Sequence, residues 1–157
     1  MEQDFTEDEE LLVRMGKFAD KTKRYMRAFF GPFLEEKGLR PHHVSFMACI
    51  HRYEGLSQKD IRNYIPYDKS RISTVVHELQ AMGIVENRAS GRNTSLALTP
   101  LGQSEYETFV KMMREFRENL LAGTDSNDLE AYYRCIAVFE KNMDELLGTE
   151  DPGDLPL

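Results

Sequence analysis

The sequence predicts a mainly α-helical fold with one small β-hairpin, arranged as a winged helix-turn-helix core between long terminal helices. Three observations predict it. Two helical patterns are separated by a break at Pro66, a strand–loop–strand pattern around Gly91 follows them, and long helical patterns with apolar stripes flank this core. Because the chain has 157 residues, we expect a single domain.

Two capping signals place the helices of the core. Ser57 precedes Asp60 by three residues, which is the spacing of a capping box, and Asp68 is the N-cap candidate of the next helix. Pro66 cannot continue a helix, and Gly83 supplies a stop for the second one. The apolar residues of this second helix recur at steps of three and four, so they predict a buried stripe of Ile72, Val75, Val76, Leu79 and Met82.

The opposite face of the second helix carries short polar side chains, with two cations in the first turn. A face selected only for solubility would more often carry Glu and Lys, which are better helix formers. Short hydroxyl side chains let a helix come close to another surface, as a helix in a DNA major groove must. The ordinary alternative is a helical core with a hairpin attached. The residues of this face are Lys69, Ser70, Arg71, Ser73, Thr74 and His77.

A β-hairpin is predicted directly after the second helix. Residues 84–88 and 94–98 read as its strands, and residues 89–93 read as its loop. Arg92 lies at the tip beside Gly91, where no packing requires a long cation. A helix-turn-helix followed by a basic hairpin is a winged-helix arrangement.

Four segments in and around this core are residues 55–61, 68–73, 79–86 and 98–102. In this order and spacing they resemble the MarR family of bacterial transcription regulators, and the match covers about residues 39–102. The resemblance implies a DNA-binding regulator that often responds to small aromatic or phenolic ligands. The family wing usually carries an Asp-x-Arg tip on a longer loop. Arg92 takes the place of the wing arginine here, and the Asp has no counterpart.

Charge is unevenly distributed along the chain. The net charge is −7, yet the segment 57–99 holds six Lys or Arg against four Asp or Glu, a net charge of +2. The rest of the chain therefore carries −9. The mildly basic segment coincides with the part that is predicted to read DNA.

Composition also bears on location and on the cysteines. No apolar run approaches the ~20 residues that a membrane span needs, and the acidic N-terminus lacks the pattern of a signal peptide, so we expect a cytoplasmic protein with no membrane partner. Cys49 and Cys135 show no CxxC spacing, so we predict neither a disulfide framework nor a zinc site. Cys49 is expected to be a small buried residue, and a redox-sensing thiol is the alternative.

Three long helices are predicted outside the core, at about residues 6–30, 100–122 and 126–147. A capping box at Thr6 opens the first, which should stop near Pro32. Each helix carries an apolar stripe that a core of about 60 residues cannot cover, and each buried CH2 contributes roughly 0.8 kcal/mol. We therefore interpret them as dimerisation helices of a two-fold homodimer, with an intrachain bundle as the alternative.

The predicted organisation is one MarR-like domain, residues 1–148, followed by a flexible tail, residues 149–157. The winged helix-turn-helix covers about residues 39–99. In full, the fold class is a mainly α winged helix-turn-helix core with a small β-hairpin, flanked by long N- and C-terminal dimerisation helices.

These inferences give a hypothesis for function. A homodimer places the second core helix of each of its two chains in successive major grooves of a pseudo-palindromic, double-stranded DNA operator. It acts as a ligand-responsive repressor. The residues predicted to contact DNA are Lys59, Lys69, Ser70, Arg71, Ser73, Thr74, His77, Arg88 and Arg92. The residues predicted to line a site for a small aromatic or phenolic effector are Tyr25, Phe29, His43 and Met47, and ordinary core packing is the alternative for each.

Other classes of function are weighed against this one. The main alternative is a winged-helix module that binds protein without specific DNA binding, which the acidic total charge favours. An enzyme is not expected, because the sequence has no Gly-rich phosphate loop and no nucleophile elbow, and no cofactor is expected either. His42 and His43 are neighbours in a helix and should point in different directions, so we expect no metal site.

Overall fold

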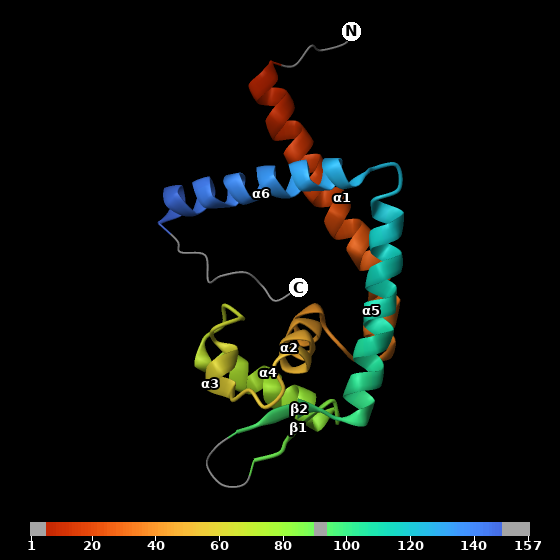
Figure 1. The fold of residues 1–157 in the computed structure, drawn as a ribbon, viewed down its shortest axis with the longest axis vertical. Coiled ribbons are helices and arrows are strands. Elements are labelled where there is room, and N and C mark those ends of the chain that lie inside the picture. Colours follow the sequence, from red (N-terminus) through yellow and green to blue (C-terminus); the bar gives the residue numbers. More distant parts are fainter. Residues whose placement is uncertain (1–5, 90–93, 149–157) are drawn as a thin grey trace. The chain divides into compact units, whose positions relative to one another are not determined.

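The computed structural model describes residues 6–89 and 94–148, and these ranges hold six helices and a two-stranded sheet (Figure 1). The chain divides into two compact units, Met1–Arg40 and Pro41–Leu157. The tail predicted at residues 149–157 lies outside the described residues. The observed architecture is that of a winged helix-turn-helix protein, as the sequence predicts.

The first unit is one long helix, α1 (Glu7–Glu36), which begins with the predicted capping box at Thr6. The prediction that this helix stops near Pro32 is wrong, because α1 continues through it for another turn. A proline disfavours helix at the residue before it mainly by clashing with that residue's Cβ. Gly31 has no Cβ, so this clash is relieved. The chain leaves the helix only before Gly38, whose positive φ of 65° suits glycine.

Three helices open the second unit: α2 (Pro41–Arg52), α3 (Gln58–Ile61) and α4 (Lys69–Ala81). The predicted caps are present. The Ser57 hydroxyl accepts from the Asp60 N–H at 3.2 Å, and the Asp68 carboxylate accepts from the Arg71 N–H at 2.8 Å. Hydrogen bonds from Ser57 also lower the pKa of Asp60. Helix-turn-helix geometry thus follows from local signals that the sequence displays.

The predicted apolar stripe of α4 is buried. Ile72, Val75, Val76 and Leu79 are at most 3% exposed, and only Met82, at the C-cap, is half-buried. The α2 helix contributes residues to the core of this unit that include Phe46, Met47, Cys49 and Ile50. With its apolar stripe committed to the core, α4 presents its polar side chains to solvent.

The hairpin consists of β1 (Val85–Asn87) and β2 (Leu96–Leu98), paired antiparallel with Val85 opposite Leu98. Both strands are shorter than predicted. The Asn87 side chain accepts hydrogen bonds from the N–H groups of Ala89 and Ser95, so a side chain replaces ladder bonds there. On its other edge, β2 binds the turn after α2, since the Gly55 N–H donates to the Leu96 carbonyl and the Leu96 N–H donates to Leu56.

Two long helices follow the hairpin, α5 (Pro100–Leu120) and α6 (Ser126–Leu147). Thr99 caps α5, Asp125 caps α6, and Gly148 ends α6 in the left-handed conformation. These bounds agree closely with the sequence prediction. Within the described ranges, no helix has the length and apolar character required to cross a lipid bilayer.

The start of α5 lies unusually close to the chain before β1. A Cβ at Gly102 would lie 2.1 Å from the Ile84 carbonyl oxygen, so Gly102→Ala should lower the free energy of unfolding by about 1–3 kcal/mol or more. Urea unfolding followed by circular dichroism measures this. Gly16→Ala is the control, because a Cβ there meets nothing within 4 Å, and we expect it to be neutral or to stabilise by up to about 1 kcal/mol. Equal stability changes in the two variants would contradict this packing.

Candidate nucleic-acid interface

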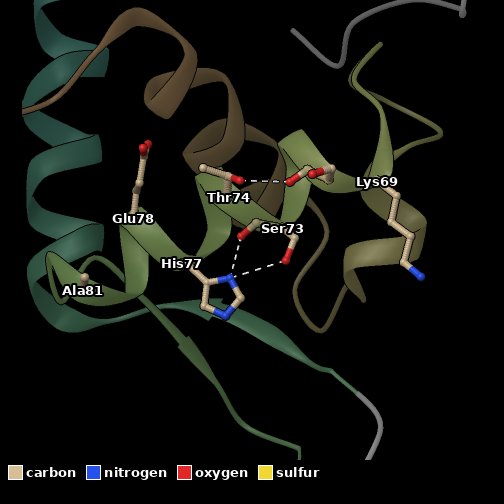
Figure 2. Close-up of a pocket in the computed structure, with 7 residues that line it drawn as sticks. Lys69, Ser73, Thr74, His77, Glu78 and Ala81 are labelled. Carbon is tan, nitrogen blue, oxygen red and sulfur yellow. Dashed lines mark hydrogen bonds between the residues drawn. The ribbon is translucent and has the colours of Figure 1, made fainter.

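The outward face of α4 forms a shallow concave surface of about 850 Å³ that is open to solvent (Figure 2). Its lining comes from α4 alone. Apart from Glu78 and Ala81, every lining residue is one that the sequence predicted to contact DNA. The lining residues are Lys69, Ser70, Ser73, Thr74, His77, Glu78 and Ala81.

The polar side chains on this surface are held by hydrogen bonds within the helix. The Thr74 hydroxyl donates to the Ser70 carbonyl at 3.0 Å, and Nδ1 of His77 lies 2.7 Å from the Ser73 carbonyl (Figure 2). Because a carbonyl can only accept, Nδ1 carries the proton, which leaves Nε2 of the neutral ring as an acceptor. The face therefore offers short side chains in fixed positions.

Arg71 is positioned at the start of α4 by an aromatic ring. Its guanidinium carbon lies 4.0 Å from the centre of the Tyr67 ring, and its Nη2 lies 3.4 Å from the Tyr67 hydroxyl. Stacking of this kind restrains a flexible cation without removing its charge. Sequence reasoning selected Arg71 and missed Tyr67, although the spacing of four residues between them was visible.

A second, smaller recess of about 300 Å³ lies between α3 and α4. Three of its lining residues are cations, Lys59, Arg62 and Lys69, and the other two are Gln58 and Ile72. None of the lining residues is acidic, so the recess suits an anion such as a phosphate. Arg62 was not among the predicted site residues, although its place in the basic segment could have indicated it.

Comparisons with known proteins agree with this geometry. Residues 37–93 match the model of the MarR family. The HTH-type transcriptional regulator YwoH of Bacillus subtilis is 27% identical over 108 residues, which are 68% of this chain and 79% of that protein. The winged helix-turn-helix segment is similar to the MarR family. The resemblance in the sequence is therefore confirmed.

Solved structures of MarR-family proteins share the fold beyond the matched segment. The MarR protein of Peptoclostridium difficile DA00132 superposes with a TM-score of 0.68 at 15% identity, covering 92% of each chain. The PcaV transcriptional regulator of Streptomyces coelicolor, solved in complex with its natural ligand, gives a TM-score of 0.64 at 17% identity. It covers 80% of this chain and 91% of PcaV. At these identities the likeness shows the fold alone.

Two arginines of the hairpin, Arg88 and Arg92, were predicted to contact DNA. Arg88 forms ion pairs with Glu54 and with Glu86, the latter at 2.9 Å, and the hydrogen bonds to these carboxylates raise the pKa of Arg88. Part of its charge is therefore neutralised within the chain. Arg92 lies outside the described residues.

The four residues predicted to line an effector site fall in two units. Tyr25 and Phe29 are half-buried on α1, with ring centres 5.9 Å apart. His43 and Met47 lie on α2 and are 3% and 1% exposed. The assignment of these four residues to a small aromatic or phenolic effector remains a prediction.

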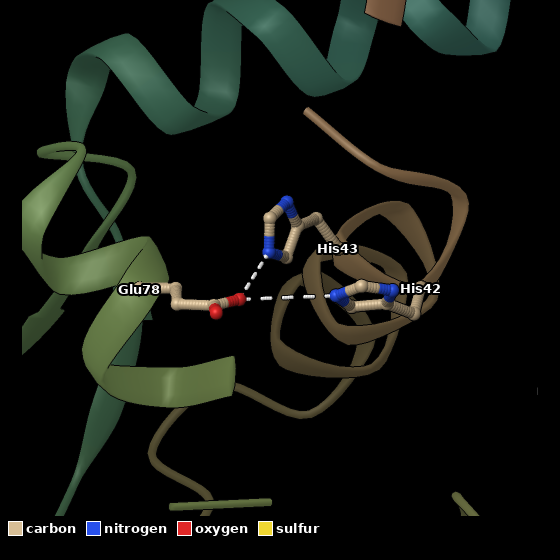
Figure 3. A group of neighbouring side chains, drawn as sticks. All are labelled: His42, His43 and Glu78. Atoms are coloured by element: carbon tan, nitrogen blue, oxygen red, sulfur yellow. Dashed lines mark hydrogen bonds and ion pairs between the residues drawn. The ribbon is translucent and has the colours of Figure 1, made fainter. Parts of the chain in front are cut away.

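His43 has a partner that the sequence did not indicate. Its Nε2 lies 2.8 Å from Oε2 of Glu78, and Nε2 of His42 lies 3.8 Å from the same oxygen (Figure 3). The expectation that neighbouring histidines point apart is wrong here, because both imidazoles turn toward one carboxylate on α4. These three side chains are a group that could hold a metal ion.

The two cysteines should differ sharply in reactivity. Cys49 is 1% exposed, and burial raises its pKa to about 11, so at pH 8 only about one thiol in a thousand is the reactive thiolate. Cys135 is exposed. We expect a disulfide reagent to label one thiol rapidly at pH 8 and the second only on unfolding. Cys135→Ser should abolish the rapid phase, and rapid labelling of that variant would instead support a redox-sensing Cys49.

Proposed function

We propose that this chain is a transcription regulator that binds a double-stranded DNA operator as a cytoplasmic homodimer, represses transcription and acts without catalysis. The observation that carries the proposal is the outward face of α4, where short hydroxyls and His77 line one exposed surface beside a basic recess, with Arg71 stacked on Tyr67 at the start of the helix. The family match supports a role in transcription.

Base readout is assigned to the polar face of α4. Ser70, Ser73 and Thr74 are short enough for the helix backbone to come close to base edges. Nε2 of His77 can accept a hydrogen bond from an exocyclic amine of adenine or cytosine. Arg71, held against Tyr67, presents a guanidinium suited to the two acceptors of guanine. A pseudo-palindromic operator follows from a two-fold dimer.

Backbone contacts are assigned to cations at the edge of this face and beyond it. The recess lined by Lys59, Arg62 and Lys69 fits a phosphate beside the helix, and Arg88 and Arg92 would approach the DNA from the wing. Such contacts fix register and orientation without reading sequence. They should make the affinity strongly dependent on salt.

Apolar surface on the long helices supports the homodimer. None of the α6 side chains is buried, and Tyr132, Phe139 and Met143, which form an apolar stripe at spacings of seven and four residues, are 46%, 43% and 47% exposed. Leaving such a stripe in water is unfavourable. The α1 and α5 helices carry further exposed apolar residues, which include Leu11, Met15, Phe18, Val110 and Met113.

Regulation by a small aromatic or phenolic effector is part of the proposal. One structural neighbour, PcaV, was solved in complex with its natural ligand. Tyr25 and Phe29 in the first unit, and His43 and Met47 in the second, are the residues proposed to contact such an effector. A ligand releases the operator only if it favours a dimer shape whose two α4 helices no longer match the DNA repeat.

DNA binding is tested on fragments that the purified protein selects from a random pool. Arg71→Ala should weaken binding to the selected site by about 5- to 150-fold, because one bidentate base contact is worth roughly 1–3 kcal/mol, and should relax the sequence preference. Thr74→Ala should reduce the preference less. Lys69→Ala should weaken all sequences alike and reduce the salt slope by about one, as measured by fluorescence anisotropy.

Lys111→Ala is the matched control, since it removes an exposed cation from α5 and should leave affinity and preference unchanged. If Arg71→Ala and Thr74→Ala both behave like this control, α4 is not the reading helix. If the protein selects no DNA and shows no salt-dependent affinity, the alternative of a protein-binding winged helix is favoured.

Dimerisation is tested by light scattering after size exclusion. The wild-type protein should have twice the chain mass of 18.2 kDa. Phe139→Glu should give a monomer, because it places a charge in the apolar stripe of α6. Lys141→Glu introduces the same side chain two residues away, outside the stripe, and should remain dimeric. A monomeric wild-type protein at micromolar concentration would contradict the proposal.

A further inference from the structure

Two helices of the second unit bring three metal-ligand side chains together. His42 and His43 lie in the first turn of α2, and Glu78 lies in the second half of α4 (Figure 3). One ring nitrogen of each histidine and a carboxylate oxygen of Glu78 all lie within 4.8 Å of one another. His43 is buried, whereas His42 and Glu78 remain partly accessible, so an ion could reach the group from solvent.

The distances between the ligand atoms suit a small divalent cation. Zinc binds imidazole nitrogen and carboxylate oxygen at about 2.0–2.2 Å, so two of its tetrahedral ligands are separated by roughly 3.3 Å. The two separations to Glu78 Oε2, 2.8 Å from His43 and 3.8 Å from His42, lie on either side of this value. Small side-chain rotations would equalise them without moving either helix.

The chemistry of the group also selects among cations. Two imidazoles and one carboxylate form a nitrogen-rich set that suits zinc and similar transition ions, whereas calcium and magnesium prefer oxygen. A neutral imidazole can bind metal through Nε2 once its proton resides on Nδ1. Two neutral rings, one carboxylate and a divalent ion leave a net charge of +1 in a partly exposed site.

We propose that His42, His43 and Glu78 bind one zinc-type divalent cation, with water in the fourth position, and thereby link α2 to the reading helix α4. Three protein ligands and one water form a known coordination pattern of zinc. The link joins segments that are 35 residues apart in the sequence. Metal binding is measured without DNA, so it can fail or succeed independently of the proposed function.

A plain hydrogen bond between His43 and Glu78 is the competing explanation for the arrangement. The variant Glu78→Gln distinguishes metal binding from this hydrogen bond, because the amide oxygen of Gln can still accept from His43 while the anionic ligand is lost. The apo variant should therefore melt close to the wild-type temperature. His42→Ala provides a second variant that leaves the hydrogen bond between His43 and Glu78 in place.

The experiment is calorimetric titration of the full chain with zinc chloride, repeated with cobalt chloride and followed by visible absorption. We expect one ion per chain, and a rise in melting temperature of roughly 5–10 °C when free zinc is a hundred times its Kd. Glu78→Gln and His42→Ala should each weaken zinc binding at least about tenfold, or ~1.4 kcal/mol. His51→Ala and Cys135→Ser are matched controls and should keep the wild-type affinity.

Two results would overturn the proposal. One is the absence of zinc binding by the wild-type chain at concentrations that leave it folded. The other is binding that Glu78→Gln and His42→Ala leave intact while His51→Ala or Cys135→Ser abolishes it, which would place the ion elsewhere. If Glu78→Gln does not fold, His42→Ala alone decides between these outcomes.

Discussion

Burial of one face of α4 is the constraint on which the reading unit depends. Ile72, Val76 and Leu79 are essentially inaccessible to water, and burying a side chain of this size contributes about 1.5–3 kcal/mol. Rotating α4 by a third of a turn would expose them and bury the hydroxyls of Ser70 and Thr74. The polar face is thus held outward by the apolar face, so the direction in which the helix can contact DNA is set by packing energy.

The hairpin is fixed to this unit by main-chain bonds along β2. Strand β2 bonds β1 on one edge and the turn at Gly55 and Leu56 on the other, so it connects α2 with the wing. At the other end of the hairpin, the start of α5 approaches the Ile84 carbonyl so closely that only a glycine fits at position 102. The wing base and the long helix therefore have defined positions relative to α4.

Much of this fold could be predicted from the sequence, because its signals are local. Caps at Ser57, Asp68 and Thr99, the stop at Gly83 and the stripe of α4 each depend on a few neighbouring residues. The exception is the end of α1, which was wrongly predicted near Pro32. Gly31 has no Cβ with which this proline could clash. Contacts between helices could not be predicted from the sequence. The pairing of His43 with Glu78 spans 35 residues, and no spacing rule along the chain indicates it.

The cations of the second unit differ in their ion pairing, which bears on the proposed binding of DNA by an acidic chain. Arg88 is paired with two carboxylates, so a phosphate must compete with them for it. Within the described residues, Lys59, Arg62 and Lys69 form no ion pair, and Lys59 interacts electrostatically with the neighbouring Asp60. The α3–α4 recess that the three cations line contains no acidic residue. Over about 8 Å, physiological salt screens the remaining negative charge. Affinity for a phosphate should therefore depend on the recess more than on the net charge of −7.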